Sequence, residues 1–288
     1  MTTRTQNAKT QLPARIEALL LEKLAALFAA AGHLDAETLH QMRVATRRLR
    51  VGLRFFAMLY PANELKQVQR QLRRLTGVLG EVRTVDVNIH LLRKAARRLP
   101  AATGAVQRKL VAGWLADRHQ HLTAVRELRQ TLATSHFQAR IRQLILKPRA
   151  LDDKRVLKEA TATLNDLRRE LRRRYRKYHR QASAAAFHKF RLAAKRYRYA
   201  LEISAAVFAT AAAPRIRAVE TLQDRTGACH DLEVLLDTLK TDKGLAGARD
   251  GVLTFFREEY AAQFNRFEEF LRDERSWTKK VKLALPHE

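Results

Sequence analysis

Two segments of the sequence carry basic residues at a spacing that suits the binding of a multiply charged anion. The first contains His40, Arg43, Arg47, Arg50 and Arg54. On a helix that advances by about 100° per residue, these side chains fall within one sector of about 80°. Like charges at this spacing repel one another and destabilise the helix, whereas an anionic ligand offsets the repulsion. Arginine also grips two phosphate oxygens at once. The spacing therefore predicts a phosphate-binding stripe, called here the first stripe.

The same pattern recurs 148 positions later as a second stripe. It consists of His188, Arg191, Lys195 and Arg198, which match the first four members of the first stripe in order. Arg48 and Arg196 also match each other and flank the stripes. Apolar residues occupy the opposite side of both segments, as expected for helices that pack on a core. Because both the basic and the apolar patterns occur twice, we interpret them as an internal repeat with a binding function rather than as solvated surface.

A second pair of matching segments follows the stripes in the same order. Residues 79–87 resemble residues 226–234, with Gly80 aligned to Gly227 and Arg83 to His230. The two pairs together predict one domain over residues 12–285, built from repeats at 12–148 and 149–285 and preceded by a flexible terminus at 1–11.

The residues around these glycines are expected to serve structure. Gly80 and Gly227 are typical of short turns between helices. Asp86, Asp231 and Glu233 then suit the start of the next helix or an ion pair with a stripe arginine.

Further basic residues lie near the stripes and are expected to extend the anion-binding surface. They are Arg73, Arg74, Arg83, Arg172 and Arg176.

The elements that carry the stripes are predicted to be helices. Only 10 Gly and 6 Pro interrupt the 288 residues, and the intervening segments are rich in Ala, Leu, Arg, Glu and Gln. Apolar and polar residues do not alternate as they do in strands. The breakers divide the chain into about ten helices, so the fold class is all-α.

The sequence lacks the motifs of common catalytic and metal sites. It has no phosphate-binding loop ending in Gly-Lys-Ser/Thr, no HExxH and no nucleophile elbow. His119 and His121 diverge on a helix, and Cys229 has no second cysteine to pair with. The longest uncharged stretch, 203–213, is too short to cross a membrane. We therefore expect a cytoplasmic, non-enzymatic protein that needs no cofactor or metal. A net charge of +27 predicts a polyanionic partner.

The twice-repeated pattern His-x-x-Arg-x-x-x-basic-basic-x-Arg, followed each time by a Leu-Gly-x-Val-Arg-like element, resembles the CHAD family, the conserved-histidine α-helical domain. The resemblance covers nearly the whole chain. It implies two antiparallel helical bundles related by pseudo-twofold symmetry, with the basic helices facing a central cavity that binds inorganic polyphosphate. It also implies a location at polyphosphate granules. The cavity residues it implies are His40, Arg43, Arg47, Arg48, Arg50, His188, Arg191, Lys195, Arg196 and Arg198.

The sequence departs from the family pattern at Thr84, where an Asp is usual, and at His230, which replaces the Arg. A nucleic-acid binder is the alternative hypothesis, since phosphate backbones attract the same side chains. Base stacking would then fall to Tyr175, Tyr178 or Tyr199, because Tyr197 points toward the predicted core.

Overall fold

The computed structural model describes residues 11–29, 34–210, 212–242 and 250–272. Every regular element in these ranges is a helix, which confirms the all-α class. About ten helices are predicted, and the described ranges contain nine α-helices. The α-helices are α1 (Gln11–Ala29), α2 (Ala36–Phe55), α3 (Ala62–Ala95), α4 (Gly104–Thr134), α5 (Phe137–Leu146), α6 (Asp153–Gln181), α7 (Ala184–Phe208), α8 (Ala213–Thr241) and α9 (Asp250–Arg272). The short 3₁₀ helices η1 (Ala57–Leu59) and η2 (Ala101–Thr103) precede α3 and α4. The flexible terminus predicted at 1–11 lies outside the described residues except for Gln11, where α1 begins.

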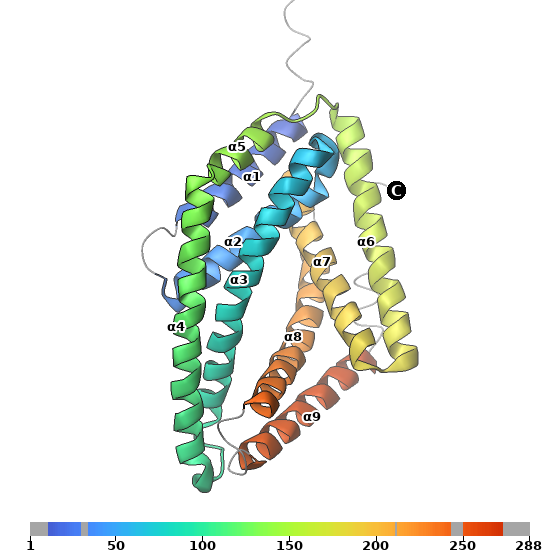
Figure 1. Ribbon diagram of the computed structural model, residues 1–288. Coiled ribbons are helices and arrows are strands. Elements are labelled where there is room, and N and C mark those ends of the chain that lie inside the picture. The colour runs from blue at the N-terminus through green and yellow to red at the C-terminus, as the bar shows by residue number, and fades with distance from the viewer. Residues whose placement is uncertain (1–10, 30–33, 211, 243–249, 273–288) are drawn as a thin grey trace, which may run out of the picture.

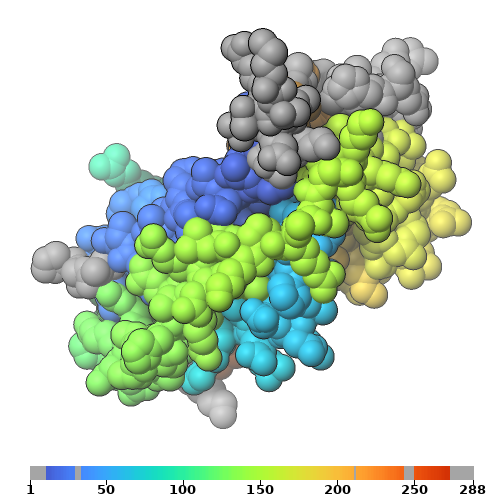
Figure 2. Space-filling model, turned by 90° about the horizontal axis from the view of Figure 1, so that it is seen from above, coloured from blue at the N-terminus to red at the C-terminus, as the bar shows by residue number. Residues whose placement is uncertain are grey.

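Within each half, consecutive helices pack on one another, and the two halves meet where α1, α2 and α3 contact α6, α7 and α8 (Figure 1). In the first half α1 packs on α2, α2 on α3 and α3 on α4; in the second, α6 packs on α7, α7 on α8 and α8 on α9. Helix α2 contacts α7, and α3 contacts α8, across the halves. Seen from above, α5 lies beside α1 and the start of α3 (Figure 2). The predicted boundary at 148/149 falls in the link between α5 and α6, while the duplication itself stays a prediction.

The two stripe helices, α2 and α7, begin with equivalent caps. The side chain of Asp35 accepts a hydrogen bond from the Thr38 backbone N–H at 2.7 Å, and that of Ser183 accepts one from Ala186 at 3.2 Å. Such caps satisfy backbone N–H groups that have no partner within the helix. Each cap lies five residues before the histidine of its stripe, with Asp35 before His40 and Ser183 before His188. The caps therefore start both stripes at the same point of their helices.

The apolar sides of the stripe helices are buried, as their periodicity predicts. Leu49, Leu53 and Phe56 in the first half are 0% exposed, and Phe190 and Tyr197 in the second are at most 2% exposed. They belong to a large core shared by both halves. A smaller core at the far ends of α3, α4, α8 and α9 contains residues such as Leu92, Trp114, Leu235 and Phe256. The large core therefore holds both stripe helices, while the smaller core joins α3 and α4 to α8 and α9.

Gly52 permits a close approach of α1 to α2. A Cβ at this position would lie 2.6 Å from Leu20 Cδ2, nearer than such atoms come in proteins. Because Leu20 is 1% exposed, its side chain has little room to move away. The glycine thus belongs to the helix contact rather than to the binding site.

The turns predicted at Gly80 and Gly227 are wrong. Both glycines lie inside continuous helices, α3 and α8, and so Asp86, Asp231 and Glu233 are not at helix starts. A helical glycine costs about 1 kcal/mol relative to alanine, which the burial of many flanking apolar side chains outweighs. A Cβ at either glycine would meet nothing within 4 Å. The glycines therefore border open space, and they leave that space unfilled.

A basic cleft as the candidate binding site

The open space beside these glycines is a cleft of about 570 Å³ between α2, α3, α7 and α8. Its lining combines cationic and polar side chains with short ones. The lining residues are Arg43, Arg47, Gly80, Arg83, Thr84, Val87, Asn88, Arg191, Lys195, Gln223, Asp224, Gly227, Ala228, His230, Asp231 and Val234. Five of the predicted site residues thus line one cleft: Arg43, Arg47, Arg83, Arg191 and Lys195.

Most of the lining comes in pairs that the two matched sequence segments supply. Each pair contributes one residue from the first half of the chain and the equivalent residue from the second. The pairs are Arg43 with Arg191, Arg47 with Lys195, Gly80 with Gly227, Arg83 with His230, Thr84 with Asp231, and Val87 with Val234. The cleft therefore lies where the matched segments of the two halves face each other.

Several buried polar atoms of the cleft have no hydrogen-bond partner among the described residues. They are Arg43 Nε, Arg191 Nε, Asn88 Oδ1, Gln223 Oε1 and His230 Nδ1. A buried polar group without a partner costs about 1–3 kcal/mol, and native proteins contain few of them. Their concentration at one place is typical of a binding site, where a ligand supplies the missing partners. The two guanidinium donors favour an anion.

The cations in the cleft destabilise one another. Burial, together with the neighbouring Arg47 and Arg83, lowers the pKa of Arg43 to about 10. Burial also lowers the pKa of Lys195 to about 7, with contributions from Arg47, Arg191 and Arg43. A shift of one unit corresponds to about 1.4 kcal/mol of lost preference for the charged form. A bound anion would restore that preference.

The histidines differ in their surroundings. Burial lowers the pKa of His40, and the nearby Arg43 and Arg83 add to the effect. Burial and Arg191 lower the pKa of His230 to about 4. Although His230 Nδ1 lies 3.5 Å from Glu233 Oε2, the neutral imidazole forms no ion pair there at pH 7. The His188 ring lies 6.0 Å from that of His230.

Two carboxylates in the cleft, Asp224 and Asp231, are absent from the sequence-predicted site. Asp231 lies close enough to raise the pKa of Arg43, Arg191 and Lys195, and so acts as an internal counter-charge. Helical spacing could have placed Asp231 in the site, because residues 223, 227, 230, 231 and 234 share one face of α8 when that helix is continuous. The turn predicted at Gly227 interrupts the helix and so hides this shared face.

Other predicted residues continue the basic surface beyond the cleft. Arg50 is half-buried, and its pKa is lowered by burial and by Arg73, Arg47, Arg54 and Arg196. These groups come from α2, α3 and α7, and Arg54, Arg73 and Arg196 are exposed. A long anion in the cleft would thus meet further arginines where it leaves.

The structure does not bring the remaining predicted residues into the cleft. Arg198 forms ion pairs of 2.7 Å with Glu202 and with Glu220. Arg48 lines a separate pocket between α1, α2 and α7. Arg74 is exposed on α3. Arg172 and Arg176 lie on α6, which does not line the cleft.

The three tyrosines predicted for base stacking are buried or hydrogen-bonded within the protein. Tyr175 and Tyr178 are buried, at 9% and 2% exposed. The Tyr199 hydroxyl accepts a hydrogen bond from Arg47, whose guanidinium carbon lies 5.4 Å from the centre of the ring. Tyr199 therefore orients a cleft arginine.

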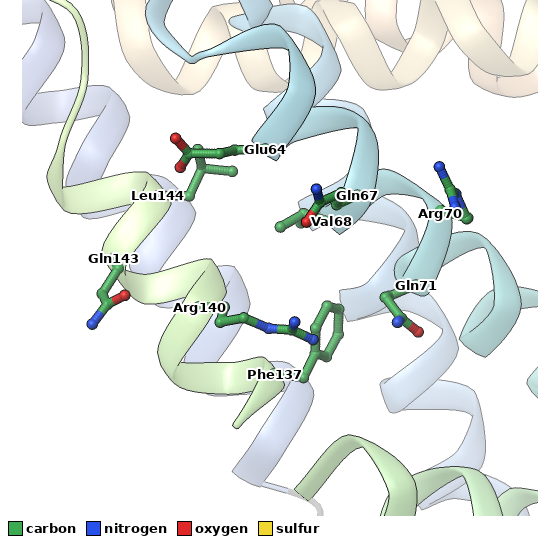
Figure 3. Close-up of a pocket in the computed structure, with 9 residues that line it drawn as sticks. All are labelled: Glu64, Gln67, Val68, Arg70, Gln71, Phe137, Arg140, Gln143 and Leu144. Carbon is green, nitrogen blue, oxygen red and sulfur yellow. The ribbon is translucent and has the colours of Figure 1, made fainter. Parts of the chain in front are cut away.

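A second pocket, of about 480 Å³, lies between α3 and α5 (Figure 3). Gln67 and Gln71 of α3 face Phe137 and Arg140 of α5 across it. It contains none of the sequence-predicted site residues.

In the described residues, no three His, Cys, Asp or Glu side chains gather as a metal site requires. None of the described helices is long and apolar enough to span a membrane.

Comparisons with known proteins agree with this architecture. The chain matches the crystal structure of the CHAD domain from the plant Ricinus communis with a TM-score of 0.69 and 24% sequence identity. The match covers 99% of this chain and 96% of that one. It matches PptA from Streptomyces chartreusis with a TM-score of 0.64 and 16% identity, over 91% of this chain and all of that one. No curated protein matches significantly. The family model of the CHAD domain matches residues 15–240, which include both stripes and the whole lining of the cleft. The chain therefore belongs to the CHAD domain family.

Proposed function

We propose that the protein binds linear inorganic polyphosphate in the cleft between α2, α3, α7 and α8. The observation that carries the proposal is the group of four arginines that line the cleft, Arg43, Arg47, Arg83 and Arg191. Two of them, Arg43 and Arg191, each have a buried Nε with no hydrogen-bond partner in the described residues. Phosphate oxygens accept strong, charge-assisted hydrogen bonds from such donors. The family resemblance supports the same ligand.

A long polyphosphate has more to gain from this surface than a single phosphate. Its repeating charges can contact the cleft and the exposed Arg54, Arg73 and Arg196 at the same time. Each additional contact forms within an existing complex, so affinity should rise with chain length until the surface is filled. Release of counterions from the polyanion adds to the binding free energy.

The decisive experiment is a competition titration of the pure protein with long-chain polyphosphate, single-stranded RNA and duplex DNA at physiological salt. Polyphosphate should bind more tightly by orders of magnitude. Equal binding of RNA or DNA would favour the nucleic-acid alternative. The buried state of Tyr175 and Tyr178 supports polyphosphate here, since they offer no exposed ring for base stacking.

A matched pair of variants locates the site. Replacing Arg43, Arg47 and Arg50 by Ala should weaken polyphosphate binding at least about a hundredfold, since hydrogen bonds to charged groups contribute about 1.5–3 kcal/mol each. The control replaces Arg126, Arg140 and Arg142, which are exposed on α4 and α5, and removes the same charge. If both variants lose affinity equally, net charge rather than the cleft determines binding.

We further propose that binding occurs without turnover and that the protein associates with polyphosphate granules in a bacterial cytoplasm. Incubation of pure protein with polyphosphate and Mg²⁺ should release no orthophosphate; steady release would contradict the proposal. A fluorescent fusion should coincide with granules, and the Arg43, Arg47 and Arg50 variant should be dispersed.

A further inference from the structure

The cleft contains one primary amine among its guanidinium groups. Lys195 is the only lysine of the lining, and within the described chain it makes no hydrogen bond or ion pair. Arg47, Arg191 and Arg43 lie near enough to repel its positive charge. The amine therefore faces a space that attracts anions but disfavours its own protonation.

This setting makes Lys195 a nucleophile near neutral pH. Burial and then the three arginines lower the pKa of its amine to about 7, so that about half of it is uncharged at pH 7. An ordinary exposed lysine, with a pKa of about 10.4, is less than about 0.1% uncharged at that pH. Lysines of lowered pKa in cationic surroundings are known as enzyme nucleophiles.

The same arginines select the electrophile that the amine would meet. A small molecule that carries a phosphate dianion would be held by Arg43, Arg47 and Arg191, and the cleft has room for it. If that phosphate is joined to an acyl group, the reactive carbonyl carbon is held beside the amine. We propose that Lys195 is a site of covalent acylation by small acyl phosphates such as acetyl phosphate.

The reaction needs no further reagent. The Lys195 Nζ lone pair attacks the carbonyl carbon, and the bond from that carbon to the bridging oxygen breaks. Inorganic phosphate leaves with the bonding electrons and takes up the proton that Nζ loses. An amide and a hydrogen phosphate dianion result. The arginines that hold the phosphate of the reactant also stabilise the charge that develops on the leaving group.

Acylation would change what the cleft can bind. The amide cannot be protonated, and its acyl group occupies space between the arginines. This consequence rests on the proposed function: the modified protein should bind polyphosphate at least about tenfold more weakly, and bound polyphosphate should protect Lys195 from reaction. The state of Lys195 would then couple polyphosphate binding to the supply of acyl phosphate.

The test compares two lysines of the same helix. The full-length protein is incubated with acetyl phosphate at pH 7.0, and the initial rates of acetylation at Lys195 and at the exposed Lys189 are measured by peptide mass spectrometry. Lys195 should react at least about tenfold faster, because its uncharged fraction is roughly a thousand times that of an ordinary exposed lysine, while its lower basicity reduces its intrinsic reactivity. An equal or lower rate at Lys195 overturns the proposal.

A second reagent isolates the part played by the arginines. The N-hydroxysuccinimide ester of acetic acid acylates amines but carries no phosphate. In the Arg43→Ala, Arg47→Ala variant, the rate at Lys195 with acetyl phosphate should fall at least about tenfold further than the rate with the ester. The variant that lacks Arg126 and Arg140 should retain both rates. If the ratio of the two rates is unchanged by loss of Arg43 and Arg47, the cleft does not collect acyl phosphates.

Titration of the unmodified protein with polyphosphate keeps the two proposals apart. Acylation of Lys195 in a protein that fails to bind polyphosphate would support the modification site and refute the proposed function. Tight polyphosphate binding by a protein whose Lys195 does not react with acetyl phosphate would support the proposed function and refute the modification site.

Discussion

Polyphosphate binding should take up a proton at Lys195. In the free cleft, burial and the neighbouring Arg47, Arg191 and Arg43 lower the pKa of this amine to about 7. A bound polyanion favours the charged form, and we expect it to return the pKa toward its ordinary value of about 10.4. The bound state then holds the proton more tightly than the free state. Affinity is therefore greatest below pH 7 and falls as the pH rises through the pKa of the free amine.

These two pKa values set the size of the effect. Proton linkage predicts that affinity falls by about tenfold between pH 6 and pH 8, and by roughly fifteenfold between pH 7 and pH 8.5. The number of protons taken up per site rises from about 0.5 at pH 7 to about 0.9 at pH 8.

The charged and titratable groups that face Lys195 keep their protonation states between about pH 6 and pH 8.5. Arg43 on α2, with a pKa of about 10, stays charged, and His230 on α8, with a pKa of about 4, stays neutral. Asp231 on α8 favours the charged amine, while Arg47 on α2 and Arg191 on α7 oppose it. His40 has a pKa below its ordinary 6.5, so its protonation would affect binding only at lower pH.

Isothermal titration calorimetry with long-chain polyphosphate, at pH 7.0 and 8.5 in buffers of different ionisation enthalpy, measures both Kd and proton uptake. Lys195→Arg is the control, because its guanidinium stays charged and should remove most of the pH dependence. If Kd in the unaltered protein changes less than twofold and no proton is taken up, Lys195 is charged in the free cleft and the reasoning fails.

Further changes test other features of the site and the fold. Raising salt from 50 to 200 mM should weaken polyphosphate binding steeply, with a log–log slope that reflects several phosphates, and a flat response in the titration would contradict electrostatic binding. Gly227→Leu should weaken binding at least about tenfold by filling the cleft while leaving Tm equal or higher, since leucine favours helix; unchanged affinity would place the ligand elsewhere. Asp231→Asn should tighten binding by roughly 1 kcal/mol, or about fivefold, because the carboxylate repels the ligand, and a weaker Kd would show that it positions Arg191 instead. Gly52→Val should lower the free energy of unfolding by about 1–3 kcal/mol in chemical denaturation, and a neutral result would mean that α1 moves away freely.

The basic stripes could be predicted from the sequence because they depend on the period of a single helix. Arg43 and Arg47 lie together on α2 for that reason alone, and Arg191 and Lys195 repeat the arrangement on α7. The apolar residues of the opposite side, such as Leu49 and Phe190, are buried for the same reason. Neither result requires knowledge of how the helices pack.

Features that depend on tertiary packing were predicted poorly. Gly80 and Gly227 suggest turns when local propensity is considered alone, yet apolar packing along α3 and α8 carries both helices through them. Asp231 then lies in mid-helix and faces the arginines. Local charge predicts Arg176 as a binding residue. It lies on α6, which does not line the cleft, so its binding role stays a prediction.

The pairing of the lining residues gives the cleft two unequal walls. The first half of the chain contributes Arg47, Arg83 and Thr84 where the second contributes Lys195, His230 and Asp231. Guanidinium groups keep their charge at physiological pH. In the other wall, however, the amine has a pKa of about 7, the imidazole is neutral, and a carboxylate is present.

This inequality has a consequence for binding. Thr84 and His230, the positions that depart from the family pattern, lie on opposite sides of the same cleft. A wall of arginines alone would bind a polyanion with an affinity that hardly depends on pH. With Lys195, His230 and Asp231 opposite, the cleft has fewer fixed positive charges when empty and gains one when polyphosphate binds. Replacing His230 by Arg should therefore tighten binding most below pH 7, where Lys195 is charged in both the free and the bound protein. At higher pH the added charge opposes the proton that Lys195 takes up on binding, so the gain in affinity is smaller.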